Sequence, residues 1–157
     1  MDLSILSQLI DIVKLLLKNN KMIRSEVLFD KSNNFWTNLF FSIDNSKKEN
    51  NYEVLEFINQ IVCIYGVDFY NYSVENDDSI FQWLKRQLYC NDESFLISVI
   101  RLLQHIVEND ISNLMEICRE LSSIKDKLEI IYHNSINHEI KDLSLISYKQ
   151  IKKKYYQ

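Results

Sequence analysis

The stretch Phe81–Val107, FQWLKRQLYCNDESFLISVIRLLQHIV, contains a short apolar-striped segment, a polar break and a longer apolar-striped segment. In the longer segment, apolar residues recur three and four positions apart, which is the spacing of one face of an α-helix. The polar break, Asn91-Asp92-Glu93, offers side chains that cap helix N-termini. The stretch therefore predicts a short helix and a long helix joined by a turn.

The composition of the whole chain favours the same kind of structure. Its 157 residues include one glycine, Gly66, and no proline, whereas average proteins contain about 7% glycine and 5% proline. So few helix-breaking residues indicate helices joined by short polar connections. No segment alternates apolar and polar residues before a hairpin turn, so we expect no β-sheet. The length suits one all-helical domain, residues 1–157.

Two further segments share the apolar pattern of the long helix predicted at 94–108. Sliding the chain on itself by 45 residues superposes a predicted helix at 52–65 on that helix, and a second shift of 45 adds one near the N-terminus. The superposed apolar positions are Leu9, Ile10, Ile12, Val13, Leu16 and Leu17; Val54, Leu55, Phe57, Ile58, Ile61 and Val62; and Val99, Ile100, Leu102, Leu103, Ile106 and Val107. Three predicted long helices thus share one register.

The same shift also superposes two predicted short helices, each of which precedes a long one. Ser32 or Asn33 is a suitable cap for the first short helix, and Asp77 or Asp78 for the second. Their aligned apolar residues are Phe35, Trp36, Leu39 and Ile43 in the first and Ile80, Phe81, Leu84 and Leu88 in the second. A short helix followed by a long one therefore repeats with a constant offset.

Two more helices are predicted towards the C-terminus. One begins at Asp110 and has a break before Leu128; its apolar residues are Leu114, Ile117, Leu121 and Ile124. Asn137 is expected to cap the last helix. The apolar face expected for that helix consists of Ile140, Leu143, Ile146 and Ile151.

Paired helices with a period near 45 residues are typical of armadillo and HEAT repeats. The stretch Asp78–Asp110, DSIFQWLKRQLYCNDESFLISVIRLLQHIVEND, resembles one armadillo-type unit. Residues 34–68 resemble a second unit more loosely, and residues 137–152 resemble a truncated last one. The resemblance implies an all-α fold, a short right-handed α-solenoid of about three and a half units. The glycine that such repeats often place between their first two helices is missing, so HEAT-like pairs or an irregular solenoid are alternatives.

In armadillo-type proteins, outward residues of the long helices form ladders that bind extended segments of partner proteins. The resemblance implies the same role here, with asparagine and glutamine side chains bonding to the partner's backbone. The predicted partner-binding residues are Asp11, Lys14, Glu56, Asn59, Arg101, Gln104 and His105. The alternative for each of them is a place on a solvated helix face.

The sequence contains no pattern that predicts catalysis, a cofactor or a metal site. His133 and His138 are five residues apart and would point in different directions on a helix. A single glycine excludes a glycine-rich phosphate loop. The three cysteines, Cys63, Cys90 and Cys118, lie at or near apolar faces and are predicted to be small buried hydrophobes. We therefore expect a protein that is not an enzyme.

Charge and hydropathy argue against other classes of partner. A net charge of −4 without a basic face argues against nucleic acid as the main partner. No apolar run approaches the roughly 20 residues that span a bilayer. The opening segment lacks the basic leading region of a signal peptide. We therefore expect an intracellular protein, cytoplasmic or nuclear, with reduced cysteines and no membrane segment.

Two functional hypotheses follow. The first is a non-catalytic scaffold or adaptor that binds another protein, alone or as a subunit of a larger assembly. Leu15 favours an assembly because it puts an apolar residue where the register expects a polar one. The alternative is a viral Bcl-2-like bundle that captures a partner helix and inhibits apoptosis or immune signalling. The composition of the present chain is rich in asparagine, isoleucine and lysine, which suits an A+T-rich genome. The tryptophan-glycine signature of the Bcl-2-like family is absent from the sequence.

Overall fold

The structure, a computed structural model, describes Gln8, Asp11, Ile12, Leu15 and residues 49–65 and 79–157. Its elements are α4 (Glu49–Tyr65), α6 (Ser79–Gln87), α7 (Glu93–Asn109), the 3-10 helix η1 (Leu114–Ile117), α8 (Leu121–Asn134) and α9 (His138–Tyr155). No strand occurs in these ranges, which confirms the all-α prediction for them. The predicted short helix of Phe35 and Trp36 and the ladder residue Lys14 lie outside the described residues.

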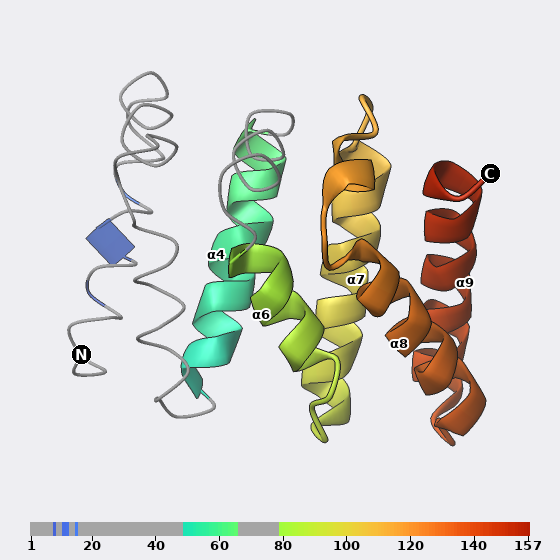
Figure 1. Cartoon of the computed structure of the whole chain (residues 1–157). Coiled ribbons are helices and arrows are strands. Elements are labelled where there is room, and N and C mark those ends of the chain that lie inside the picture. Colours follow the sequence, from blue (N-terminus) through green and yellow to red (C-terminus); the bar gives the residue numbers. More distant parts are fainter. Residues whose placement is uncertain (1–7, 9–10, 13–14, 16–48, 66–78) are drawn as a thin grey trace.

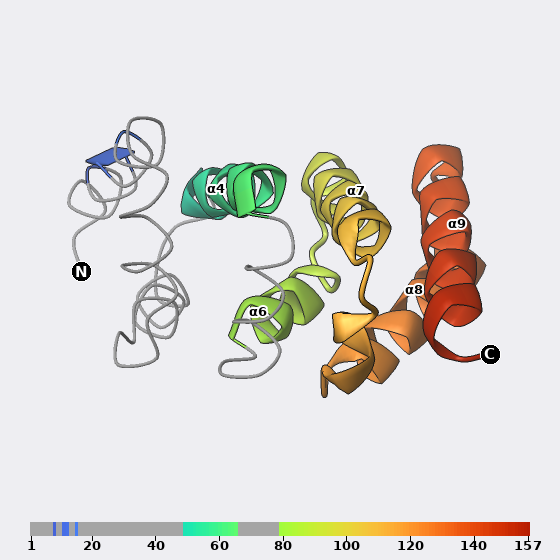
Figure 2. The ribbon, with the colours of Figure 1, turned by 90° about the horizontal axis from the view of Figure 1, so that it is seen from above.

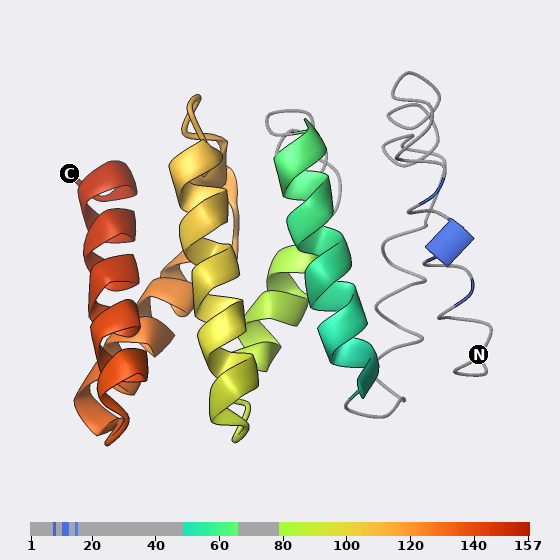
Figure 3. The ribbon, with the colours of Figure 1, turned by 180° about the vertical axis from the view of Figure 1, so that it is seen from behind.

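The helices lie in two layers. The long helices α4, α7 and α9 stand side by side in one layer (Figure 1), and α7 packs against α4 on one side and α9 on the other. The shorter α6 and α8 lie together on one side of this row (Figure 2). On the opposite side, no part of the chain that the structure describes covers the three long helices (Figure 3).

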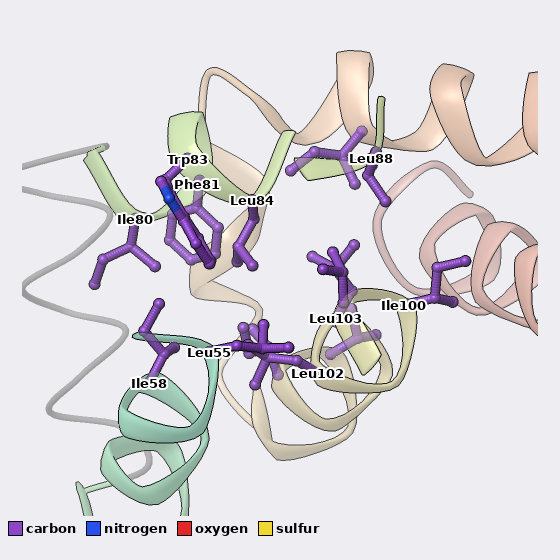
Figure 4. Close-up of a cluster of buried hydrophobic side chains, with 14 of the residues drawn as sticks. Leu55, Ile58, Ile80, Phe81, Trp83, Leu84, Leu88, Ile100, Leu102 and Leu103 are labelled. Atoms are coloured by element: carbon purple, nitrogen blue, oxygen red, sulfur yellow. The ribbon is translucent and has the colours of Figure 1, made fainter. Parts of the chain in front are cut away.

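The core lies between the two layers. On α4 and on α7, all six residues that the shared register assigns to the apolar face are buried. From the second layer, α6 contributes Ile80, Phe81, Trp83 and Leu84 (Figure 4). Trp83 is completely buried. Full burial of one such side chain contributes roughly 1.5–3 kcal/mol, so this core is a large source of the stability.

The turn between α6 and α7 forms as the sequence predicts. Asp92 is the N-cap of α7, and its Oδ1 accepts a hydrogen bond from the backbone N–H of Phe95 at 3.2 Å. Cys90 Sγ in turn accepts the backbone N–H of Asp92 at 3.3 Å. These contacts fix the direction in which α7 leaves the turn, so its apolar face meets α6.

The first helix departs from the predicted register at Ile12. Its side chain is 55% exposed, although the superposed residues Phe57 and Leu102 are 0% and 3% exposed. On α7 this position faces the preceding long helix, since Leu102 lines a hollow beside α4. Among the described residues, no helix precedes Ile12 to cover it in the same way. Leu15 is also exposed, as its place in the register predicts.

The predicted helix beginning at Asp110 is wrong. Asp110 is fully buried, and its two carboxylate oxygens accept the backbone N–H groups of Leu114 at 2.8 Å and Met115 at 2.9 Å. The chain bends around this carboxylate, with Asn113 in the left-handed conformation (φ 57°). The α-helix starts only at Leu121 and runs through Leu128 without the predicted break.

The last helix begins as predicted but buries a different face. Asn137 caps α9, because its Oδ1 accepts the N–H groups of Glu139 and Ile140. Ile146, predicted to be inward, is 49% exposed. The buried residues of α9 are Ile140, Ser144, Ser147, Ile151 and Tyr155. α9 packs against both α7 and α8, and small serines on the contact face let both helices approach.

Asp110 and Tyr155 provide a first test of this packing. Tyr155 Oη donates to Asp110 Oδ2 at 2.6 Å in a buried position, so Tyr155→Phe leaves the carboxylate one donor short. We expect the free energy of unfolding to fall by about 1.5–3 kcal/mol in urea denaturation. The matched control is Tyr156→Phe, since Tyr156 is 46% exposed. Equal stability of the two variants would contradict a structural role for the buried bond.

The buried serines of α9 provide a second test. Ser147 Oγ is buried without a hydrogen-bond partner among the residues that the structure describes. Ser147→Ala removes this desolvated hydroxyl and improves helix propensity, so we expect the free energy of unfolding to rise by about 0.5–2 kcal/mol. Ser98→Ala is the control, because Ser98 Oγ already bonds to the carbonyl of Ser94 at 3.2 Å. A loss of stability in Ser147→Ala would show that its hydroxyl is satisfied.

Candidate binding groove

An open groove with a volume of about 410 Å³ runs between α4 and α7. It is lined by Tyr52, Glu53, Leu55, Glu56, Asn59, Ser98, Arg101 and Leu102. The buried side chains of Leu55 and Leu102 belong to the apolar core, and the more exposed lining residues are polar or aromatic. Three of the predicted partner-binding residues, Glu56, Asn59 and Arg101, thus come together around one hollow.

The two walls of the groove carry opposite charges. The α4 wall presents Glu53 and Glu56, and the α7 wall presents Arg101. Arg101 Nη2 donates to Glu139 Oε1 of α9 at 2.7 Å, yet the Arg101 side chain is 61% exposed. A guanidinium group has five N–H donors, so Arg101 has the capacity to bind a second acceptor while it keeps Glu139.

Beyond the groove, His105 joins the two long helices. Its Nδ1 lies 3.0 Å from Asn59 Oδ1, and its Nε2 lies 4.0 Å from Cys63 Sγ. Asn59 and Cys63 are four residues apart on α4 and therefore lie on the same side of that helix. The side chain of His105 is half-buried, and this predicted partner-binding residue already contacts α4.

The cysteines differ from their prediction at one position. Cys118 is buried and Cys90 is half-buried, but Cys63 is exposed. The prediction of a small buried hydrophobe is therefore wrong for Cys63, because it stands on the polar side of α4 one turn beyond Asn59. All three cysteines are free thiols.

The remaining predicted residues do not line the groove. Asp11 is exposed in the first helix, and Gln104 is half-buried on α7. Five lining residues were absent from the predicted set: Tyr52, Glu53 and Ser98, and the core residues Leu55 and Leu102. Glu53 and Ser98 are 45 residues apart, so the repeat register that selected Glu56 and Arg101 also relates these two. The register was therefore the feature of the sequence from which Glu53 and Ser98 could have been predicted as neighbours.

The described part of the chain contains no cluster typical of a metal site and no helix typical of a membrane span. Across 49–65 and 79–157, no three histidine, cysteine, aspartate or glutamate side chains gather as a metal site would require. No helix there has the length and apolar character needed to cross a bilayer. Comparison with family models, with curated proteins and with solved structures gave no match to this chain.

Proposed function

We propose that this protein is a non-catalytic scaffold that binds an extended segment of a partner protein in the groove between α4 and α7. One observation carries the proposal: the register that buries the core residues of both helices also puts Glu56 and Arg101 on facing walls of one hollow. The partner-binding residues of the proposal are Glu56, Asn59 and Arg101, with Asp11, Lys14, Gln104 and His105 extending the ladders to either side.

We also propose that the two layers form a short right-handed α-solenoid of about three and a half armadillo- or HEAT-like units. Hydrogen bonds that link α4, α7 and α9 support a repeat, because they join residues 38 to 47 positions apart. A separation near 45 is expected where equivalent positions of consecutive units lie side by side. The order of short and long helices agrees with this pairing.

The charges of the groove define what the partner segment should contain. A basic side chain of the segment would face Glu53 and Glu56, and an acidic side chain or backbone carbonyl would face Arg101. Asn59 has a carboxamide that can bond to the extended backbone of the segment. The ladder continues to α9, where the position 45 residues after Arg101 is the exposed Ile146. An apolar residue of the segment fits that place.

Selection from a library of random peptides tests the function directly. With the full chain as target, we expect enrichment of peptides that combine basic, acidic and apolar residues and that bind in an extended conformation. Enriched peptides that bind as amphipathic helices would instead favour the Bcl-2-like alternative. If the selection yields no peptides that compete with one another for binding to the groove, the scaffold proposal is contradicted.

Charge reversal at Arg101 tests the ladder. In Arg101→Glu both walls are acidic, so we expect the affinity for a selected peptide to fall at least tenfold, about 1.4 kcal/mol, in fluorescence anisotropy. The melting temperature should barely change, because an exposed ion pair contributes only about 0–1 kcal/mol. Arg119→Glu, the same substitution at an exposed position before α8, should leave the affinity unchanged. Wild-type affinity in Arg101→Glu would remove the ladder hypothesis.

Solution scattering tests the proposed solenoid. A compact domain of 157 residues has a radius of gyration of about 15 Å. Units stacked in a row give a longer particle, so we expect a clearly larger radius and an asymmetric distance distribution for the monomer. A radius near 15 Å with a symmetric distribution would favour a helical bundle.

A further inference from the structure

The three thiols of the chain differ in their surroundings. Cys118 is buried, and Cys90 is half-buried with its sulfur accepting the N–H of Asp92. Cys63 is exposed and is the one thiol for which the structure gives a contact with a histidine ring. Thiolates, rather than thiols, are nucleophiles, so a neighbouring proton acceptor decides how fast an exposed cysteine reacts.

The orientation of His105 gives its ring a defined role. The Asn59 oxygen accepts hydrogen bonds and cannot donate, so the bond at 3.0 Å requires the proton of the neutral ring on Nδ1. Nε2 then carries the lone pair, and it is the ring nitrogen that lies 4.0 Å from Cys63 Sγ. Cys63 is thus placed as a nucleophile next to His105 as its base, and Asn59 is the third group, which orients the base.

The groove ends next to this group, although neither Cys63 nor His105 lines it. Asn59 contributes to the lining of the 410 Å³ groove as well as to the orientation of His105. Cys63 lies one helical turn further along α4, on the same side as Asn59. A small molecule held at this end of the groove would therefore come close to the exposed sulfur.

We propose that Cys63 is a reactive thiol assisted by His105, and that the exposed surface beside the end of the groove is a site of covalent modification by small disulfides. The Cys63 proton passes to His105 Nε2, and the thiolate attacks one sulfur of the disulfide. The S–S bond of the disulfide breaks as the mixed disulfide forms. The departing thiolate takes the proton from His105, so atoms and electrons balance and the ring returns to its starting state.

The alternative is that His105 only packs between the helices. In that case Cys63 reacts at the rate of any exposed cysteine, and the ring has no effect on it. The reaction rate of the unfolded chain distinguishes the effect of exposure from the effect of His105. In the unfolded chain Cys63 is fully exposed, but His105 is no longer near it. Assistance makes the native thiol react faster than the unfolded one, and it makes this advantage depend on the His105 ring.

The test uses the full chain and 2,2′-dithiodipyridine, a neutral disulfide that the carboxylates of the groove do not repel. The rate of thiopyridone release is measured near neutral pH for the native protein and for the same protein in urea, and mass spectrometry locates the adduct. We expect native Cys63 to react more than fivefold faster than in His105→Gln, and also faster than in the unfolded chain. Asn59→Ala should give an intermediate rate, because the ring is present but not oriented.

Matched controls keep the outcome decisive. Cys63→Ser should remove the fast phase, and the slow phase of Cys90 gives an internal reference in each variant. Continued protection of the buried Cys118 shows that a variant is folded. If Cys63 in His105→Gln reacts within fivefold of the wild type, or if native Cys63 is slower than the unfolded thiol, the proposal is overturned. Because peptide binding is measured separately, failure of the scaffold proposal would leave this result unaffected.

Discussion

The apolar face of α7 is the constraint on which the rest of the described structure depends. It meets α6 in the second layer, while the flanks of the helix pack against α4 and α9. Buried residues such as Val99, Ile106 and Val107 leave only a narrow stripe of α7 for solvent. That stripe carries Ser98, Arg101 and His105, and so the packing of the core determines which polar groups reach the groove and its end.

A second constraint acts at the end of α7. A buried carboxylate is costly unless its hydrogen bonds are satisfied, and Asp110 accepts two backbone N–H groups and the hydroxyl of Tyr155. The bond to Tyr155 connects the end of α7 to the end of α9, so the loop between η1 and α7 and the position of the last helix are fixed together. Few other polar residues of the described chain are buried so completely.

The sequence predicted α4 and α7 well because apolar spacing and burial coincide there. Prediction failed at Asp110, whose side chain resembles an ordinary helix cap until Tyr155, 45 residues away, is known to contact it. Prediction also failed at Ile146, because the buried face of α9 was predicted from the positions of its apolar residues. Applying the 45-residue register instead relates Val99 to Ser144 and Leu102 to Ser147, and both serines are buried. For α9, the 45-residue register was a better guide than hydrophobicity.

The same reasoning explains why the groove was only partly predictable. The register identified Glu56 and Arg101 as neighbours, but side chains reach obliquely across the seam between parallel helices. His105 contacts Asn59 and Cys63, which are 46 and 42 residues earlier and so flank the 45-residue offset by a few positions. A linear alignment pairs His105 with Gln60 and cannot show this contact. Since buried positions occupy one side of each long helix, the exposed side is free to change without loss of the core. The chemistry of this groove must therefore be determined from side-chain geometry, even where the order of helices is readable from sequence.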